Sequence, residues 1–162
     1  YNDFLYVGGY SHNMYQISLS GEIVTEYQGE NWVWGTPVIK DNILYYTDLG
    51  GYVYALNPDG LTEIWSERPA SRGIRPSPLV TDDYVIVSSR DGVVYWLDSE
   101  TGQTIQQAEV DGRPELLSDI LYLPADEELG HPELILVASA DTGRLVTAFN
   151  METFSPQWVY GR

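Results

Sequence analysis

The sequence predicts an all-β fold made of about four tandem sheets, and three observations support this prediction. The chain has 162 residues with 13 Tyr and 5 Trp but only 3 Phe, and aromatic side chains of this kind suit the half-buried surface of a sheet. Short apolar runs alternate with turns rich in Gly, Asp and Pro at intervals of about 8 to 12 residues, as in all-β proteins. One motif also recurs along the chain, and no segment shows sustained helical periodicity.

The recurring motif is an alternating apolar run, a glycine-containing turn and a second run that carries a tyrosine. Tyr15, Tyr54 and Tyr95 hold the same place in three copies, and a degenerate fourth copy covers 134–149. With the flanking segments, each copy reads as four short antiparallel strands. A period of about 40 residues with four strands per unit is typical of β-propeller blades. We therefore expect one propeller segment over residues 1–162, with repeats at about 3–34, 35–75, 76–113 and 114–160.

The first strand of each repeat is expected after a proline, at 36–39, at 77–80 and more loosely at 114–117. Repeat one has no such run, so its sheet is expected to lack the innermost strand. An acidic insertion, 118–132, falls between the first two strands of repeat four and is expected to project from one rim. Its apolar half, 120–123, could extend the first strand. Both a protein-contact role and a simple surface loop are compatible with this insertion.

Repeat two carries the most specific pattern of the chain. From Pro37 to Trp65 it reads Pro-Val-x-x-Asp-x-x-Leu-Tyr-x-x-x-x-x-Gly-x-Val-Tyr-Ala-Leu-Asn-x-x-Gly-x-x-x-x-Trp. This pattern resembles the pyrroloquinoline-quinone-like, or quinoprotein-type, β-propeller repeat, and the resemblance covers nearly the whole chain. Propellers of the WD and YWTD types are the alternatives, since Tyr45-Tyr-Thr-Asp48 is similar to the YWTD box.

The resemblance implies how successive blades are joined. In that family the tryptophan that closes the outer strand docks between neighbouring blades; Trp65 and Trp158 match this position, and Tyr27 is expected there in repeat one. Such rings usually have seven or eight blades, so the chain is expected to form a partial ring, about half of a propeller. The remaining blades are expected either from the same polypeptide or from a second copy in a homodimer that completes the ring.

Charge and composition exclude several classes of function. The net charge is −16, from 24 acidic and 8 basic residues, and such a charge repels nucleic acid and anionic lipid. No apolar run approaches the roughly 18 residues that cross a bilayer, so direct membrane insertion is not expected. The chain has no cysteine, which excludes disulfides and thiolate metal sites.

Most of the basic residues are expected on one rim of the propeller. Arginines in the blade-to-blade connections and in one middle hairpin fall there, together with two tryptophans and a histidine. Arginine suits bidentate recognition of carboxylates, and aromatic rings offer stacking faces. This predicts a rim that binds an anionic or aromatic ligand or an acidic peptide; the alternative is that these arginines pair with nearby carboxylates. The candidate residues are Arg68, Arg72, Arg75, Arg90, Arg113, Trp32, Trp34 and His12.

Motifs for catalysis are mostly absent. The two histidines do not form a metal-binding pair, and no carboxylate cluster has metal spacing. Asp48, Asp91 and Asp141 recur in hairpin turns, where aspartate normally caps its own turn. We expect no catalytic residue, no metal and no cofactor, although a quinone-dependent alcohol or sugar dehydrogenase fragment, with pyrroloquinoline quinone and calcium, remains an alternative implied by the resemblance.

Together these features favour a non-catalytic scaffold for protein–protein interaction in an extracytoplasmic complex. The expectation of outer-membrane assembly propellers as relatives, and of a periplasmic or cell-surface location, comes from the resemblance and not from the residues. A propeller that binds a small anionic or sugar-like ligand at the arginine-bearing rim is the third hypothesis.

Overall fold

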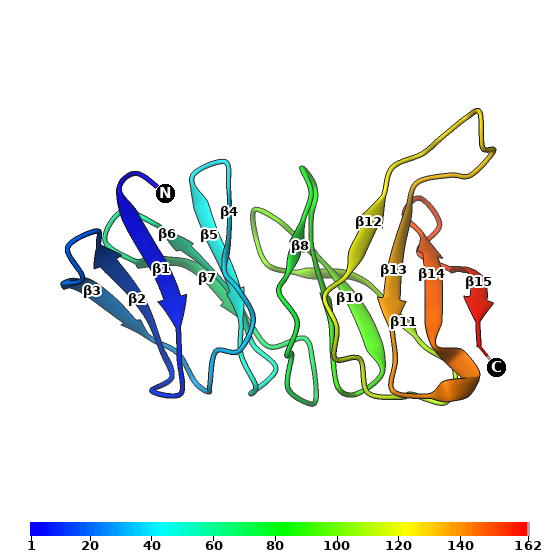
Figure 1. The fold of residues 1–162 in the computed structure, drawn as a ribbon, viewed down its shortest axis with the longest axis horizontal. Helices are drawn as coiled ribbons and strands as arrows, with labels where there is room; N and C mark the ends of the chain where they lie inside the picture. Colours follow the sequence, from blue (N-terminus) through cyan, green and yellow to red (C-terminus); the bar gives the residue numbers. More distant parts are fainter. Residues whose placement is uncertain (162) are drawn as a thin grey trace.

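The computed structural model describes residues 1–161 as four antiparallel sheets that stand side by side in chain order (Figure 1). The first sheet has three strands, β1 (Phe4–Gly8), β2 (Asn13–Ser18) and β3 (Ile23–Gln28). The second has β4 (Val38–Lys40), β5 (Ile43–Thr47), β6 (Val53–Asn57) and β7 (Thr62–Glu67). The third has β8 (Leu79–Val80), β9 (Tyr84–Ser88), β10 (Val93–Asp98) and β11 (Thr104–Glu109). The fourth has β12 (Leu121–Leu123), β13 (Leu134–Ala138), β14 (Val146–Asn150) and β15 (Pro156–Tyr160), with a 3-10 turn, η1 (Thr142–Arg144), before β14.

Each sheet is a meander in which strands adjacent in sequence are paired, and the four sheets are consecutive blades of a β-propeller, which confirms the expected fold class. We number them blades one to four. The expected absence of an innermost strand from blade one is also confirmed, because only β1, β2 and β3 form that sheet.

The hydrogen-bonding register confirms that the blades are true repeats. Tyr15, Tyr54 and Tyr95 each stand one residue before the position at which the pairing with the outer strand shifts. Thr147 holds this place in blade four. The same bulge at the same point in four sheets shows that these residues occupy equivalent places, so residues of different blades can be compared directly.

The hydrophobic core lies between the sheets. Side chains alternate along each strand, so each blade buries one set against the blade before it and the other against the blade after it. In blade two, Leu44, Tyr46 and Tyr54 pack toward blade one, whereas Tyr45 and Val53 pack toward blade three. A third cluster, which includes Trp96 and Phe149, joins blades three and four. Burial of these apolar faces holds the blades together.

The first strand of blade four differs from the expected one. It is β12, within the segment assigned to the acidic insertion, while Leu116 in 114–117 makes only an isolated bridge to Ser139. The reason is that Ile120, and not Pro114, takes the place of Pro37 and Pro78 one residue before the inner strand. The insertion is therefore shorter, and its tip closes through a bridge between Asp126 and His131. It projects above β12 and β13 at the top of Figure 1.

The residues expected to dock between blades occupy three different environments. Trp65 is 7% exposed and donates its indole N–H to the carbonyl oxygen of Ser99 in blade three, at 3.1 Å. Trp158 has the same register, opposite Ala148, but is 42% exposed. Tyr27 does not hold this place. Because the turn between β2 and β3 is one residue shorter than in the other blades, Thr25 faces Gln16 at the bulge, and Tyr27 lies two residues further on.

Tyr27 nevertheless contacts the next blade. Its ring packs edge-on against Tyr54, with 5.9 Å between the ring centroids, and its hydroxyl donates to Glu63.

Among residues 1–161 the structure has no helix long and apolar enough to span a membrane.

Candidate functional site

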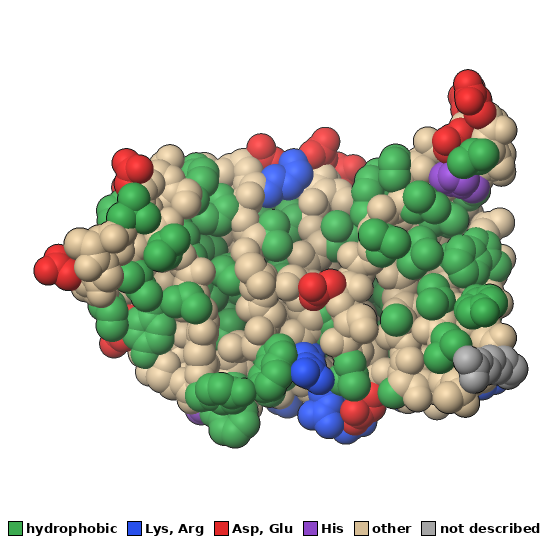
Figure 2. Space-filling model, viewed as in Figure 1, with side chains coloured by type: hydrophobic (Ala, Val, Ile, Leu, Met, Phe, Trp, Pro, Cys, Tyr) green, Lys and Arg blue, Asp and Glu red, His purple; other side chains and the backbone are tan. Residues whose placement is uncertain are grey.

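The arginine-bearing rim is formed by the blade-to-blade connections and the middle hairpins, at the lower edge of Figures 1 and 2. These segments leave the strands on one side of every sheet, so residues far apart in sequence meet there. All six arginines that the structure describes lie on this rim, whereas Lys40 lies on the opposite one, paired with Asp41 and Asp82. Arg144, in η1, belongs to the rim and was missing from the sequence prediction.

Two of the predicted arginines share one carboxylate. Arg72 and Arg90 both contact an oxygen of Glu115, at 2.5 and 3.0 Å, and the Arg72 guanidinium also donates to the backbone oxygen of Arg90. Arg90 first, and then Arg72, lower the pKa of Glu115 below its usual range. This group links the connections of blades two, three and four, and it neutralises much of the positive charge that an anionic ligand would need.

Arg113 and Arg144 are also paired with carboxylates. Arg113 forms an ion pair with Glu109, four residues earlier in the sequence. Arg144 contacts Asp111 and, at 3.3 Å, Asp141. These pairs are solvent-exposed, so each contributes little to stability. For Arg72, Arg90 and Arg113 the structure matches the alternative that the arginines pair with nearby carboxylates.

Arg75 is bound in a different way. Its guanidinium carbon lies 4.5 Å from the centre of the Trp34 ring, a cation–π arrangement, and no carboxylate lies within ion-pair distance among the contacts of residues 1–161. Arg68 similarly stands 5.5 Å from the Tyr52 ring centre and donates through Nε to the backbone oxygen of Gly50. These two guanidinium groups keep hydrogen-bond donors free for a partner.

An aromatic cluster extends from Arg75 to the edge of blade one. Tyr10 contacts Trp32 and Trp34 edge-on, with centroid distances of 5.0 and 5.9 Å. The exposed fractions are 64% for Tyr10, 44% for Trp32 and 48% for Trp34. Figure 2 shows hydrophobic side chains that protrude beside basic and acidic ones at this edge. Tyr10 was also missing from the prediction, although its spacing in the first middle hairpin places it on this rim.

Two shallow grooves lie beside this cluster. They have volumes of about 280 and 300 Å³ and share Trp34, Arg75 and Leu117. Hydrogen bonds from backbone N–H groups to side chains connect the neighbouring blades here. The N–H of Thr36 donates to the Ser77 hydroxyl at 3.0 Å, and the N–H of Ser77 donates to the Asp119 carboxylate at 2.7 Å. The surface around Arg75 is therefore supported by three blades.

His12 and the hairpin aspartates have structural surroundings. The backbone oxygen of His12 accepts a hydrogen bond from the N–H of Gly29. The φ of His12 is positive, at 70°, as in a tight turn. Asp48 is fully buried and accepts from the Gly50 and Tyr52 N–H groups and from the Tyr54 hydroxyl. In residues 1–161 no group of three or more His, Asp or Glu side chains could hold a metal ion.

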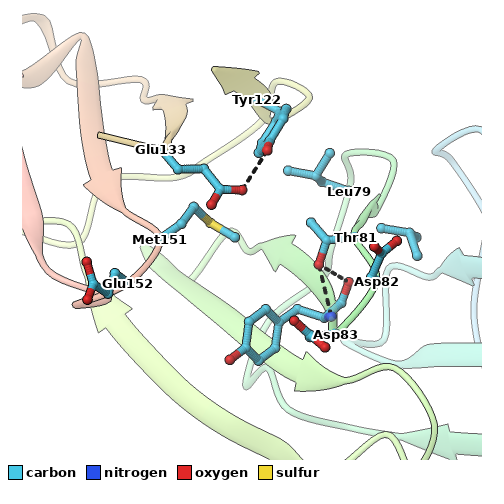
Figure 3. Close-up of a pocket in the computed structure, with 10 residues that line it drawn as sticks. Leu79, Thr81, Asp82, Asp83, Tyr122, Glu133, Met151 and Glu152 are labelled. Carbon is cyan, nitrogen blue, oxygen red and sulfur yellow. Dashed lines mark hydrogen bonds between the residues drawn. The ribbon is translucent and has the colours of Figure 1, made fainter. Parts of the chain in front are cut away.

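A third groove opens on the opposite, acidic rim between blades three and four (Figure 3). Its volume is about 500 Å³, and Leu79, Tyr84 and Met151 form its apolar part. The Tyr122 hydroxyl donates to Glu133 at 2.6 Å, which raises the pKa of Tyr122. The other polar residues that line this groove include Asp82, Asp83 and Glu152. The Asp82-Asp83 turn and the acidic insertion, both visible in the sequence, are the signals that could have located this groove.

Comparisons with known proteins agree with the repeat architecture. The profile of the family described as outer membrane protein assembly factor BamB matches residues 1–161. The BamB protein of Escherichia coli (strain K12) is 26% identical over 74 residues, which cover 46% of this chain and 19% of that protein. BamB of Salmonella typhimurium (strain LT2) is 23% identical over 111 residues, 68% of this chain and 28% of that protein. The chain thus spans less than a third of these relatives.

Solved structures show the same fold. The crystal structure of BamB from Moraxella catarrhalis superposes with a TM-score of 0.73 at 22% identity, covering 99% of this chain and 46% of that one. The WD40 β-propeller domain of Doa1 superposes with a TM-score of 0.74 at 18% identity and covers 99% and 51%. By its match over residues 1–161, the chain belongs to the BamB family of pyrroloquinoline-quinone-like repeat propellers.

Proposed function

We propose that this chain is part of a non-catalytic propeller scaffold that binds other proteins during outer membrane protein assembly, outside the cytoplasm. The observation that carries the proposal is the family match along residues 1–161, since the relatives are named as outer membrane protein assembly factors. The proposal includes no cofactor and no catalytic residue.

The arginine-bearing rim supplies a suitable protein-binding surface. Trp, Tyr and Arg dominate the energetics of protein interfaces, and Tyr10, Trp32, Trp34 and Arg75 form one exposed cluster. The cluster stands on tightly paired sheets, so little conformational entropy is lost when a partner binds. Arg75 adds charge-assisted hydrogen bonds to acidic groups of the partner. We therefore assign partner binding to this cluster.

The rim favours a protein partner over a small anionic ligand. Four of the six described arginines already contact carboxylates, so their charge is not focused on one pocket. The grooves beside Arg75 are open and shallow, whereas small-molecule sites usually enclose most of the ligand. A broad surface with a protruding aromatic cluster matches a protein interface better.

A photo-crosslinking amino acid at Trp34 tests this function in cells. We expect adducts with proteins of outer membrane protein assembly, identified by mass spectrometry. The matched control is the same amino acid at Ile64, which is equally exposed (48% each) but lies on an outer strand. Equal adduct patterns at both positions, or adducts with no outer-membrane assembly protein, would contradict the proposal.

A further inference from the structure

The groove between blades three and four lies on the rim opposite the arginine-bearing one, and its two sides come from different blades (Figure 3). Blade three supplies Leu79 and Asp83, and blade four supplies Glu133 and Met151. The volume of the groove, about 500 Å³, falls within the range of known ligand sites.

The preceding interface shows what stands at this level of the rim between blades two and three. Lys40, the last residue of β4, reaches across to Asp82 in the turn after β8, with 2.5 Å between Nζ and the carboxylate oxygen. The same ammonium group lies 2.8 Å from the carboxylate of Asp41 in its own blade. A lysine of one blade thus bridges to an acidic turn of the next.

Between blades three and four this lysine is missing. The pairing of the inner strands places Thr81 where blade two has Lys40, and the Thr81 hydroxyl accepts from the N–H of Tyr84 in its own turn, at 3.0 Å. Blade four nevertheless keeps an acidic residue here, because Glu133 stands one residue before β13 as Asp83 stands one residue before β9. This interface therefore retains carboxylates and lacks the cation.

The carboxylates of the groove have no basic partner within the described part of the chain. Asp83, Glu133 and Glu152 form no ion pair among residues 1–161. The Tyr122 hydroxyl donates to Oε1 of Glu133 at 2.6 Å and leaves Oε2 without a hydrogen bond from the described residues. Lys40, the basic residue that the structure describes on this rim, is already engaged with two aspartates. The groove therefore favours a cationic ligand.

The apolar part of the groove selects among cations. Leu79, Tyr84 and Met151 belong to the hydrophobic cluster that joins blades three and four, and they also line the groove. Lysine and arginine bury their aliphatic stems on such a surface while the charged group stays among polar atoms. Among residues 1–161, no three acidic or histidine side chains are placed to hold a metal ion. The lining thus matches a basic side chain.

An adjoining groove extends the acidic surface along the rim. It has a volume of about 360 Å³ and shares Asp82, Asp83 and Tyr84 with the first, and its further lining includes Asp98 and Glu100. The acidic turn therefore separates two grooves, and a ligand that follows both must be longer than one side chain. An extended peptide segment meets this condition.

We propose that the groove between blades three and four binds a basic, extended segment of a partner protein, in which one lysine or arginine takes the place that Lys40 holds at the preceding interface. The aliphatic stem of that side chain packs on Leu79 and Met151, and its charged group is held by Asp83 and Glu133. The acidic insertion begins and ends beside this groove, and its charge attracts a basic segment before contact.

Fluorescence anisotropy with a short labelled peptide of alternating valine and lysine tests the site, at about 0.15 M salt to limit long-range attraction. Glu133→Gln removes one charge and keeps an acceptor for Tyr122. This variant should bind the peptide about tenfold more weakly, as for the loss of one charge-assisted hydrogen bond. The matched control is Glu127→Gln, the same charge change at the tip of the insertion, which should leave the affinity unchanged.

Thr81→Lys supplies the missing cation from within the chain. The new side chain should occupy the groove as Lys40 occupies the preceding interface, and most of the peptide binding should be lost. Thr62→Lys, the same charge change on the exposed start of β7, should retain binding. A second peptide with diaminobutyrate in place of lysine keeps the charge but shortens the stem, and it should bind the unmodified chain more weakly.

Three results would overturn the proposal. One is equal affinity of the lysine peptide for wild type, Glu133→Gln and Thr81→Lys. Another is equal binding of the lysine and diaminobutyrate peptides, which would indicate attraction by charge alone. The third is displacement of the peptide by an equal concentration of spermidine, which would assign the groove to a small cation. Trp34→Ala, on the opposite rim, should not change peptide binding, so this site and the proposed partner surface are tested separately.

Discussion

Trp65 is replaced at the other blade interfaces by different side chains that fill the same space. Blade one uses Tyr6 and Gln16, which reach the Pro58 carbonyl. In blade three the equivalent outer-strand residue is the exposed Gln106, and Trp96, directly opposite it on β10, fills the interface instead. Trp96 packs against Phe149 and Phe154, with ring centroids 6.0 and 5.5 Å away. A repeat therefore keeps the volume at this site but not the identity of the residue that provides it.

Replacing Gly102 with alanine should destabilise the chain by about 1–3 kcal/mol more than replacing Gly60, because only the Gly102 methyl group would collide with Trp65. Both glycines have similar positive φ values, 75° and 83°, so the backbone strain of alanine is shared and cancels in the comparison. Urea unfolding of the two variants measures the difference. Equal stability of Gly102→Ala and Gly60→Ala would show that the contact with Trp65 does not fix the spacing of the blades.

At the residue scale, the sequence identifies the aromatic and arginine residues but not their partners. Arg72 and Glu115 are 43 positions apart, and no local pattern links them; only the stacking of blades brings them together. The register of Tyr27 differs from that of Trp65 for another reason that the sequence does not show: one residue fewer in the β2–β3 turn shifts the outer strand against the bulge.

The connections between blades are held on the arginine-bearing rim by a small set of charged contacts. Glu115, which precedes β12, reaches Arg72 before β8 and Arg90 in the β9–β10 hairpin. The connections are also tied by backbone bonds, as between the N–H of Arg90 and the Gly73 carbonyl oxygen. The carboxylate thus restrains elements of three blades at once.

The contribution of Glu115 should depend on pH in a defined direction. Its pKa is lowered in the folded chain, so its stabilising effect is complete above the pKa of the unfolded chain, about 4.3, and is lost as the pH falls below that value. The melting temperature of wild type should therefore exceed that of Glu115→Gln at pH 7, and the gap should close between about pH 4.5 and 3.

The control for this measurement is Glu127→Gln, at the exposed tip of the insertion, which has no ion pair among the contacts of the described residues. Glu127→Gln should not lower the melting temperature at pH 7 or at pH 3. A gap between wild type and Glu115→Gln that stays constant from pH 7 to pH 3 would show that the carboxylate charge is not what restrains the connections.

Elements in blades two and three could be predicted from sequence because their turns, prolines and alternating runs agree. Blade four was harder, since Pro114 imitates the proline that precedes the other inner strands, while Ile120 holds the equivalent place. Tertiary pairing decides this case: Leu121–Leu123 match the register of β13, and Leu116 is buried instead beneath the blade interface.

The two rims of the molecule differ in their content of basic residues. One rim carries the six described arginines, four of them paired with carboxylates, whereas the opposite rim carries the acidic turns and the insertion tip, with Lys40 as its basic residue among the described ones (Figure 2). Such a field orients an approaching partner before contact. The rim that holds Trp34 and Arg75 is therefore the less acidic of the two.

The overall fold was the part most accessible from sequence, because a period of about 40 residues with four strands per unit permits few architectures. The binding surface was less accessible: which arginines are neutralised depends on contacts between blades.

Distances between spin labels test the central claim, that equivalent repeats fan about one axis. Since the chain has no cysteine, pairs of cysteines at the bulge positions Val24, Ile64, Ile105 and Gln157 can be labelled cleanly and diluted into unlabelled protein. Neighbouring pairs should give equal distances within a few ångströms, and the Val24–Ile105 distance should be shorter than the sum of its two steps. Unequal steps, or steps that add in a straight line, would contradict the account.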